Sequence, residues 1–220
     1  MNDQMVLKLI STLPAEKQKR INRFVRKEDG IRTLAAEILS RLLICRRLSI
    51  KNSAIELEYN HYGKPLIKGN MNLYFNNSHS GEWVVSAISD TPVGTDVERI
   101  SEINIGIAER FFSPCEFNDL MQKEGEDRLK YFFDLWTLKE SYIKAIGIGL
   151  SLPLSSFTIS LKGDKVSINT QNELNCFFFR QYIIDSGYRL ALCSAYDRFP
   201  NQVEIVNFNE IAEVFLNYYN

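Results

Sequence analysis

The sequence predicts an α+β protein built from two similar halves. Helical patterns are followed by short antiparallel strand patterns twice along the chain. A short sequence pattern also occurs twice, in which a glycine is followed by a mostly apolar run and then by Ser-Ala. It reads GEWVVSAIS in the first half and GYRLALCSAY in the second. No proline- or glycine-rich linker separates the halves. We therefore expect two subdomains, residues 1–93 and 94–220, that share an interface.

Composition is that of an ordinary globular protein, with 220 residues, 45% hydrophobic, 24% charged and a formal net charge of −1. This near-neutral charge argues against a general nucleic-acid or membrane-surface binder, although basic residues gather in the first 47 positions and keep a local anionic partner open. Four scattered cysteines and two histidines offer no zinc-ligand spacing. The chain has no secretory signal pattern and no apolar run of ~18 residues, so we expect a cytoplasmic protein.

The first half begins with helical patterns. Pro14 stands where a first helical residue belongs, and the apolar side that follows predicts a basic helix over 14–27. Asp29 is the expected cap of a longer helix whose apolar residues keep the 3.6-residue period as far as Cys45. Runs rich in β-formers between Gly, Pro and Asn then predict strands at 55–60, 73–80, 82–89 and 93–100.

The second half repeats this order. Ser113-Pro114-Cys115-Glu116 has the form of a capping box with proline at the first helical position. Asp127 is the expected cap of a long helix that ends at Gly147. Strand patterns follow at 155–161, 165–170, 176–185, 188–196 and 203–206, before a closing helix capped by Asn209.

Two acids stand one residue apart in the strand pattern VGTDVERI. Alternate residues of a strand point to the same face, so Asp96 and Glu98 point in one direction. Either that face is solvated or something positive lies on it. Two acids ~6.6 Å apart along a strand are able to share a hard cation, and a third acid from a helix would complete the site. Carboxylate ligands suit Mg²⁺ better than zinc.

A third acid interrupts an apolar helical seam. Leu129, Phe133, Trp136 and Ile143 place the next core residue at position 140, which is a glutamate. A carboxylate on such a seam is costly unless it meets a cation or hydrogen-bond donors. The simpler interpretation makes Glu140 an i,i+4 surface partner of Lys144.

The remaining polar motifs point to phosphate. In NNSHS, Ser78 and His79 precede a turn at Gly81, where hydroxyl, imidazole and backbone N–H groups are able to converge on an anion. A lone histidine is also often a structural residue with satisfied hydrogen bonds. Lys64 of YGKP stands on a rigid turn and by itself reads as a solvated lysine.

At this order and spacing the motifs resemble those of the Sfp-type 4′-phosphopantetheinyl transferases. The matching stretches are YGKP at 62–65, FNNSHSGEW at 75–83, VGTDVE at 93–98, RFFSPCEF at 110–117 and LWTLKESYIKAIGIGLSLPL at 135–154. The resemblance implies two α+β subdomains related by a pseudo-two-fold, each a small antiparallel sheet with packed helices, and an active site at their interface.

The resemblance also implies an activity and its residues. Such enzymes transfer the phosphopantetheine arm of coenzyme A to a serine of an acyl or peptidyl carrier protein and release adenosine 3′,5′-bisphosphate. By match to the motifs, Asp96, Glu98 and Glu140 would bind Mg²⁺. The implied coenzyme-binding residues are Lys17, Arg20, Thr33, Lys64, Ser78, His79, Lys139 and Lys144. Candidates for catalysis are Glu140, Glu116 and Lys144, with Glu140 favoured as general base.

Two other functions remain open at this point. One is a non-catalytic module that binds coenzyme A or a carrier protein, and the other is a Mg²⁺-dependent phosphohydrolase. Carriers of fatty-acid, polyketide and non-ribosomal peptide synthesis all remain possible, and a role in antibiotic biosynthesis is the favoured guess. Two internal halves remove the need for a second subunit, which favours a monomer.

Overall fold

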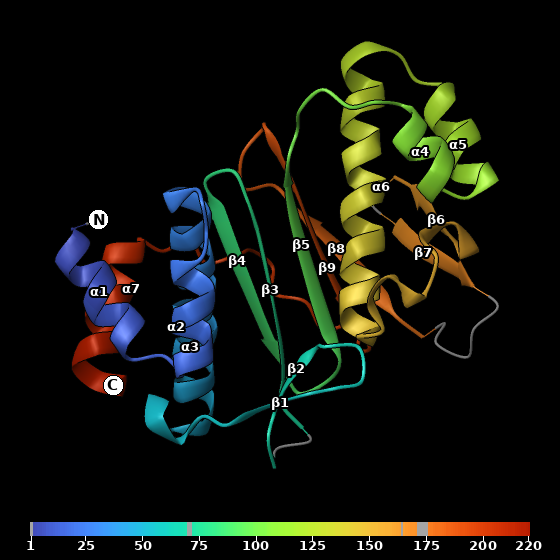
Figure 1. Cartoon of the computed structure of the whole chain (residues 1–220). Coiled ribbons are helices and arrows are strands. Elements are labelled where there is room, and N and C mark those ends of the chain that lie inside the picture. Colours follow the sequence, from blue (N-terminus) through green and yellow to red (C-terminus); the bar gives the residue numbers. More distant parts are fainter. Residues whose placement is uncertain (1, 70–71, 164, 171–175) are drawn as a thin grey trace.

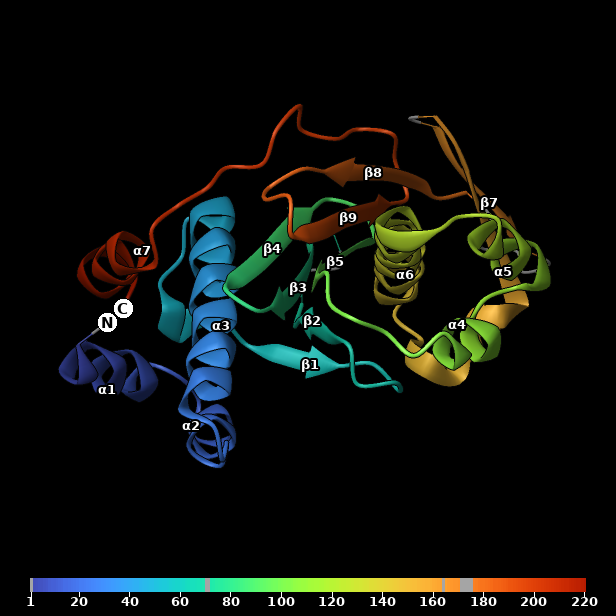
Figure 2. The ribbon, with the colours of Figure 1, turned by 90° about the horizontal axis from the view of Figure 1, so that it is seen from above.

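Two long helices flank the strands at the centre of the molecule. In both views of the computed structural model, the strands lie between α3 (Lys27–Leu48) and α6 (Gly125–Ile146) (Figures 1 and 2). The predicted α+β class, with small antiparallel sheets and packed helices, is therefore confirmed. The structure describes residues 2–69, 72–163, 165–170 and 176–220.

The first half is a hairpin covered by α3. Strand β3 (Tyr74–Ser80) pairs antiparallel with β4 (Trp83–Ser89), and α3 contacts both. A smaller antiparallel pair, β1 (Leu57–Tyr59) and β2 (Pro65–Ile67), precedes it. The strands predicted at 55–60, 73–80 and 82–89 are confirmed as β1, β3 and β4.

The second half is a three-stranded antiparallel sheet on which α6 packs. Its order is β5 (Val93–Arg99), β9 (Tyr188–Ser194) and β8 (Phe178–Tyr182), and α6 contacts β5 and β9. The elements that connect α6 and the sheet are short, and they are α4 (Gly106–Phe111), α5 (Pro114–Met121), η2 (Gly149–Ser151), η3 (Leu154–Ser156), β6 (Phe157–Lys162) and β7 (Lys165–Thr170). Strands β6 and β7 form a hairpin of their own.

Several predicted helix ends are confirmed. Both hydrogen bonds of the Ser113–Glu116 capping box are present, with Pro114 at the first helical position of α5. Gly147 ends α6 with a φ of 74°, a left-handed conformation that favours glycine. Helix α6 and its stop signal were therefore readable from local sequence alone.

Other ends differ from the prediction. The expected helix 14–27 is shorter, α2 (Ala15–Asn22), and α3 already begins at Lys27. Asp29 consequently lies inside the first turn of α3, where it pairs with Arg32, instead of capping the helix. Acids favour the positive end of a helix whether they cap it or lie in the first turn, so the pattern located the end only to within a few residues.

The predicted N-caps of α6 and α7 (Phe208–Val214) also differ from the observed ones by a few residues. Helix α6 begins at Gly125, which puts Asp127 in its first turn. The cap of α7 is Asn207, whose side chain accepts from the N–H of Asn209. Residues 203–206 form no strand. The prediction missed the helical segments α1 (Asp3–Ser11), η1 (Asn52–Ala54), η2 and η3 and the strand β2.

The C-terminal segment returns to the first half. Ile211, Ala212 and Phe215, from α7 and the following η4 (Phe215–Tyr219), share a core with Leu9 and Leu34 of α1 and α3 (Figure 1). The predicted second subdomain, 94–220, therefore does not describe this segment, which packs with residues of the first. No helix in the described ranges is both long and apolar enough to cross a lipid bilayer.

Gly94 lets α6 approach β5 closely. A methyl group on Gly94 would lie 2.1 Å from the backbone oxygen of Ser141 and 2.3 Å from the backbone nitrogen of Ala145. Neither backbone atom can yield without moving the helix away from the strand. The glycine of VGTDVE is thus required by helix–strand packing.

We expect Gly94→Ala to lower the free energy of unfolding by roughly 1–3 kcal/mol or more, because an overpacked contact against backbone relaxes poorly. Thermal unfolding followed by circular dichroism measures the loss. Gly106→Ala is the matched control, because the added methyl would meet only a side-chain oxygen, that of Asn104 at 3.2 Å. Equal melting temperatures for Gly94→Ala and the unmodified protein would contradict the close contact.

Candidate active site

Asp96 lies buried on β5 and meets a positive partner. Its side chain is 3% exposed, and its Oδ1 is 2.6 Å from Nζ of Lys144, which projects from α6. The hydroxyl of Ser78, on β3, donates to the same Oδ1 at 2.9 Å. The alternative of a solvated strand face is therefore wrong for Asp96. The positive group on that face is Lys144.

Lys144 bridges the two halves. Besides Asp96, its ammonium donates to Oγ of Ser78 at 3.0 Å and to the backbone oxygen of Thr95 at 3.2 Å. Its side chain is 26% exposed, so the ammonium is not sealed from solvent. Its partner is Asp96 and not Glu140, which makes the predicted i,i+4 surface pair wrong.

Glu98 and Glu140 are half-buried beside Asp96. Glu98, on β5, accepts a hydrogen bond from Oγ of Ser80 at 2.8 Å. Burial raises the pKa of both glutamates, and the charge of Asp96 raises each further. Burial also raises the pKa of Asp96, against the opposing effects of Lys144 and Ser78. Three carboxylates thus share one electrostatic neighbourhood with the ammonium of Lys144.

This neighbourhood favours a cation. Oδ2 of Asp96 is buried without a hydrogen-bond partner among the described residues, which is costly for a carboxylate oxygen. Carboxylate oxygens are the ligands that Mg²⁺ prefers. By donor chemistry the three acids fit such an ion. As the side chains stand, however, no three His, Cys, Asp or Glu residues in the described ranges are close enough to hold one. The metal assignment therefore stays a prediction.

His79 lies exposed next to this neighbourhood, on the same strand as Ser78. Its pKa is lowered, chiefly because part of the imidazole is withdrawn from water and then because Arg32 carries a positive charge nearby; Lys144 adds to the effect. Arg32 comes from α3 and donates to the backbone oxygen of Gly81 at 3.1 Å. Arg32 was missed as a candidate, and the only sequence signal was the basic concentration of the first 47 residues.

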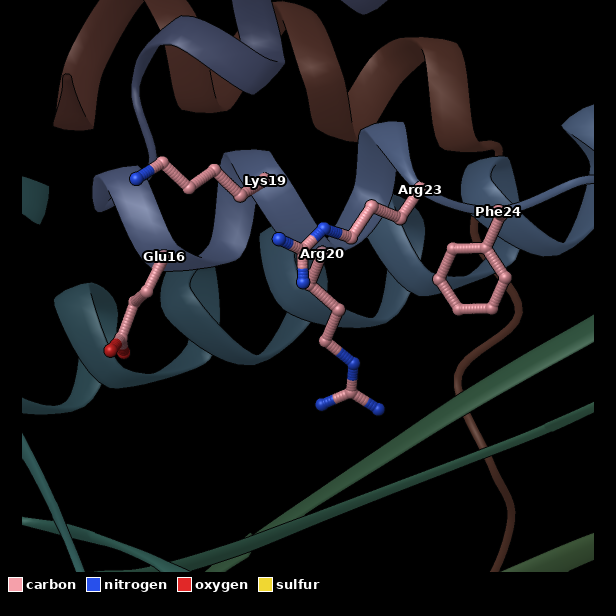
Figure 3. A pocket seen from close by; sticks show the side chains of 5 residues that line it. All are labelled: Glu16, Lys19, Arg20, Arg23 and Phe24. Atoms are coloured by element: carbon pink, nitrogen blue, oxygen red, sulfur yellow. The ribbon is translucent and has the colours of Figure 1, made fainter.

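Arg20 lines a hollow on the surface of α2. The cavity has a volume of about 540 Å³ and is bordered by Glu16, Lys19, Arg20, Arg23 and Phe24 (Figure 3). In Figure 3, the side chain of Arg20 extends away from its helix. Three cations against one acid make this hollow attractive to an anion.

Two other N-terminal candidates are placed differently. Lys17 pairs with Glu37 at 3.2 Å and lies over the ring of Tyr59, 5.8 Å from its centroid. Thr33 is half-buried on α3, next to Arg32 in sequence. The predicted coenzyme-binding roles of both remain untested predictions.

Lys64 is not the solvated lysine that its motif suggests. Its ammonium donates to the backbone oxygens of Lys144 at 2.6 Å, Ala145 at 2.9 Å and Val93 at 3.2 Å. These contacts use the three N–H bonds of the ammonium, and burial lowers the pKa of Lys64 to about 8. Lys64 thus binds the negative end of α6 and joins it to the turn before β2. As the side chain lies here, all three of its N–H groups face backbone oxygens, and its predicted coenzyme contact stays a prediction.

Glu116 and Lys139 form a buried ion pair. Their side chains are 1% and 0% exposed, with Nζ 2.6 and 2.7 Å from the two carboxylate oxygens. Glu116 also accepts from the backbone N–H groups of Ser113 and Ile159. Neither side chain reaches solvent, so the structure contradicts a coenzyme contact for Lys139 and a general-base role for Glu116. The pair instead joins α5 and α6 to β6.

Comparison with known proteins agrees with these motifs. Residues 2–91 match the family model described as 4′-phosphopantetheinyl transferase, N-terminal, and residues 92–193 match the model of the 4′-phosphopantetheinyl transferase superfamily. The 4′-phosphopantetheinyl transferase ffp of Bacillus subtilis is 40% identical over 205 residues, 93% of this chain and 92% of the relative. The enzyme gsp of Aneurinibacillus migulanus is 40% identical over 210 residues, 95% and 88% of the two chains.

A solved structure, the holo-(acyl-carrier-protein) synthase of Thermotoga maritima, is similar over 47% of this chain and 61% of its own, with a TM-score of 0.40 and 20% identity. The family is established by the sequence relatives, which span nearly the whole chain at 40% identity. On that basis, the chain belongs to the 4′-phosphopantetheinyl transferase superfamily.

Proposed function

We propose that this enzyme transfers the 4′-phosphopantetheine arm of coenzyme A to a serine of an apo acyl or peptidyl carrier protein, with Mg²⁺, and releases adenosine 3′,5′-bisphosphate. The observation that carries the proposal is the grouping of Asp96, Glu98 and Glu140 around Lys144, where the halves meet. It occurs in a chain whose relatives are named as these transferases over nearly its full length.

The acids are suited to a phosphoryl-type reaction. Such transfers depend on alignment and on neutralised phosphate oxygens more than on covalent help from the protein. Asp96, Glu98 and Glu140 would hold the Mg²⁺, which when bound supplies positive charge to the pyrophosphate of coenzyme A. Lys144 is partly exposed at the edge of the acids, where its ammonium would meet a pyrophosphate oxygen.

Glu140 is the best-placed general base. The carrier serine must lose a proton during transfer, and a base works best when its pKa is near the working pH. Burial and then the charge of Asp96 raise the pKa of Glu140, against the opposing effect of Lys144. Its carboxylate forms no hydrogen bond or ion pair with the residues that the structure describes, in contrast to the fully bonded Glu116.

The basic side of the site would hold the nucleotide. Arg32 lies near His79, which follows Ser78 on β3, and Arg20 lines the cavity on α2. Imidazole and guanidinium groups suit the 3′-phosphate of coenzyme A, because both donate charged or directional hydrogen bonds to phosphate oxygens. Lys139 is left out of this set, because its ammonium is buried on Glu116.

Replacing His79 by alanine should weaken coenzyme binding more than chemistry. The KM for coenzyme A is expected to rise about tenfold with kcat largely kept, because a lost phosphate contact affects ground state and transition state alike. Steady-state kinetics with varied coenzyme A measures both constants. His61→Ala, the same change at the other histidine, is the control and should leave the KM unchanged. A lower kcat with unchanged KM for His79→Ala would contradict this role.

The function itself is tested by mass spectrometry of the carrier. The protein is incubated with coenzyme A, Mg²⁺ and an apo carrier protein. A gain equal to one phosphopantetheine arm on the carrier supports the transferase. Retention of coenzyme A without transfer would indicate a binding module, and release of product without a carrier would indicate a hydrolase. Comparing carriers of fatty-acid, polyketide and peptide synthesis in the same assay identifies the one that is served.

A further inference from the structure

Side chains, and not backbone pairs, join the two sheets where the halves meet. Strands β3 and β5 lie side by side, yet each belongs to a different sheet (Figure 1). Three side chains of β3 accept hydrogen bonds from backbone N–H groups of β5, in the pairs Asn76–Thr95 at 2.8 Å, Ser78–Val97 at 3.3 Å and Ser80–Arg99 at 3.1 Å. Each pair is separated by 19 residues, so the bonds form a regular ladder.

Two of these three rungs also touch the acids. The hydroxyl of Ser78 donates to Oδ1 of Asp96, and that of Ser80 donates to Oε2 of Glu98 at 2.8 Å. A hydroxyl has one proton to donate, and each serine accepts from the backbone N–H that follows the acid. Its only proton is therefore directed to the carboxylate. Asn76 makes the same bond to the backbone but contacts no acid.

We propose that Ser80 is a positioning residue that orients the carboxylate of Glu98 for the metal ion. The backbone N–H of Arg99 donates to the hydroxyl oxygen of Ser80 and holds it in place. The hydroxyl in turn donates to Oε2 of Glu98, which leaves Oε1 of Glu98 as the atom available to an ion. Groups that hydrogen-bond to metal-ligating carboxylates fix their orientation, and losing one typically weakens metal binding about 10–100-fold. This inference rests on the proposed function, since that function requires the ion.

Ser80 is a cleaner probe than Ser78. The oxygen of Ser78 also accepts from Lys144, so its removal would disturb the ammonium and Asp96 together. Ser80 contacts Glu98 and the backbone of Arg99 alone among the bonds found in the described chain. Asn76 provides the matched control, because Asn76→Ala removes one rung and leaves every acid with its partners.

Calorimetric titration of Mg²⁺ into the full-length protein preloaded with coenzyme A tests the inference without any carrier. Ser80→Ala is expected to bind Mg²⁺ about tenfold more weakly, and Ser80→Thr, which keeps the hydroxyl, to bind as the unmodified protein does. Asn76→Ala should lower the melting temperature as much as Ser80→Ala but keep the Mg²⁺ affinity. In the transfer assay, Ser80→Ala should need about tenfold more Mg²⁺ for half-maximal rate and recover most of kcat at saturation.

Three results would overturn the inference. Unchanged Mg²⁺ affinity in Ser80→Ala would show that the hydroxyl does not orient Glu98. Equal weakening in Asn76→Ala would assign the effect to the ladder as a whole. If the unmodified protein took up no Mg²⁺ while still binding coenzyme A, the metal assignment in the proposed function would fail, and the role of Ser80 with it.

Discussion

Asp96→Ala is expected to abolish transfer, with a loss of at least about a hundredfold in the rate of carrier modification. Loss of a group that merely supports a metal ligand already costs about 10–100-fold, and Asp96 is a proposed ligand itself. Its Oδ2 is a buried oxygen that has no hydrogen-bond partner among the described residues, and its Oδ1 accepts from both Lys144 and Ser78. Alanine removes all of these contacts, and a water molecule does not replace the charge.

Initial rates at saturating coenzyme A and Mg²⁺, measured by the mass of the carrier, give the size of the effect. Asp96→Asn keeps the side-chain volume and tests whether charge is what matters, so it should be nearly as inactive as alanine. Asp90→Ala removes an exposed acid that pairs with Arg47 outside the site and should retain activity. Full activity of Asp96→Ala at ordinary Mg²⁺ would show that the acids have been misassigned.

Lys139→Met is expected to cause the largest loss of stability, about 3–5 kcal/mol of unfolding free energy. Removing one partner of a buried ion pair leaves the other charge without compensation in the interior. Lys139 donates to both oxygens of Glu116 and to the backbone oxygen of Phe157 at 2.8 Å. Burial lowers the pKa of Lys139 to about 8, against the opposing effect of Glu116. For a chain of this size the loss corresponds to a melting temperature roughly 10 °C lower.

Thermal unfolding of a double-mutant cycle separates the interaction energy of the Glu116–Lys139 pair from the contribution that each side chain makes by packing. Glu116→Gln combined with Lys139→Met removes both charges, so the double variant should be more stable than Lys139→Met alone. The coenzyme-binding role implied by the family motif makes the opposite prediction. If Lys139 contacted coenzyme A, Lys139→Met would keep its melting temperature and raise the KM for coenzyme A.

Local patterns predicted most of the elements. The two-residue period located the strands around Asp96, and the 3.6-residue period located α3 and α6. Caps with a specific backbone requirement were also readable, such as the Ser113 capping box and Gly147. Caps predicted from a nearby acid, Asp29 and Asp127, were misplaced by three residues, because an acid stabilises a helix from any position in its first turn.

The sequence by itself thus determined the family and the α+β class, because both follow from short spacings and motifs, and it predicted the acids of the site. Only the tertiary structure decided what the lysines do. Lys64, Lys139 and Lys144 look equivalent in their motifs, yet one binds the end of α6, one is buried on Glu116 and one meets Asp96. A lysine head group lies on a long flexible stem, and each partner is more than twenty residues away in sequence. Local spacing therefore carries no information about which partner it finds.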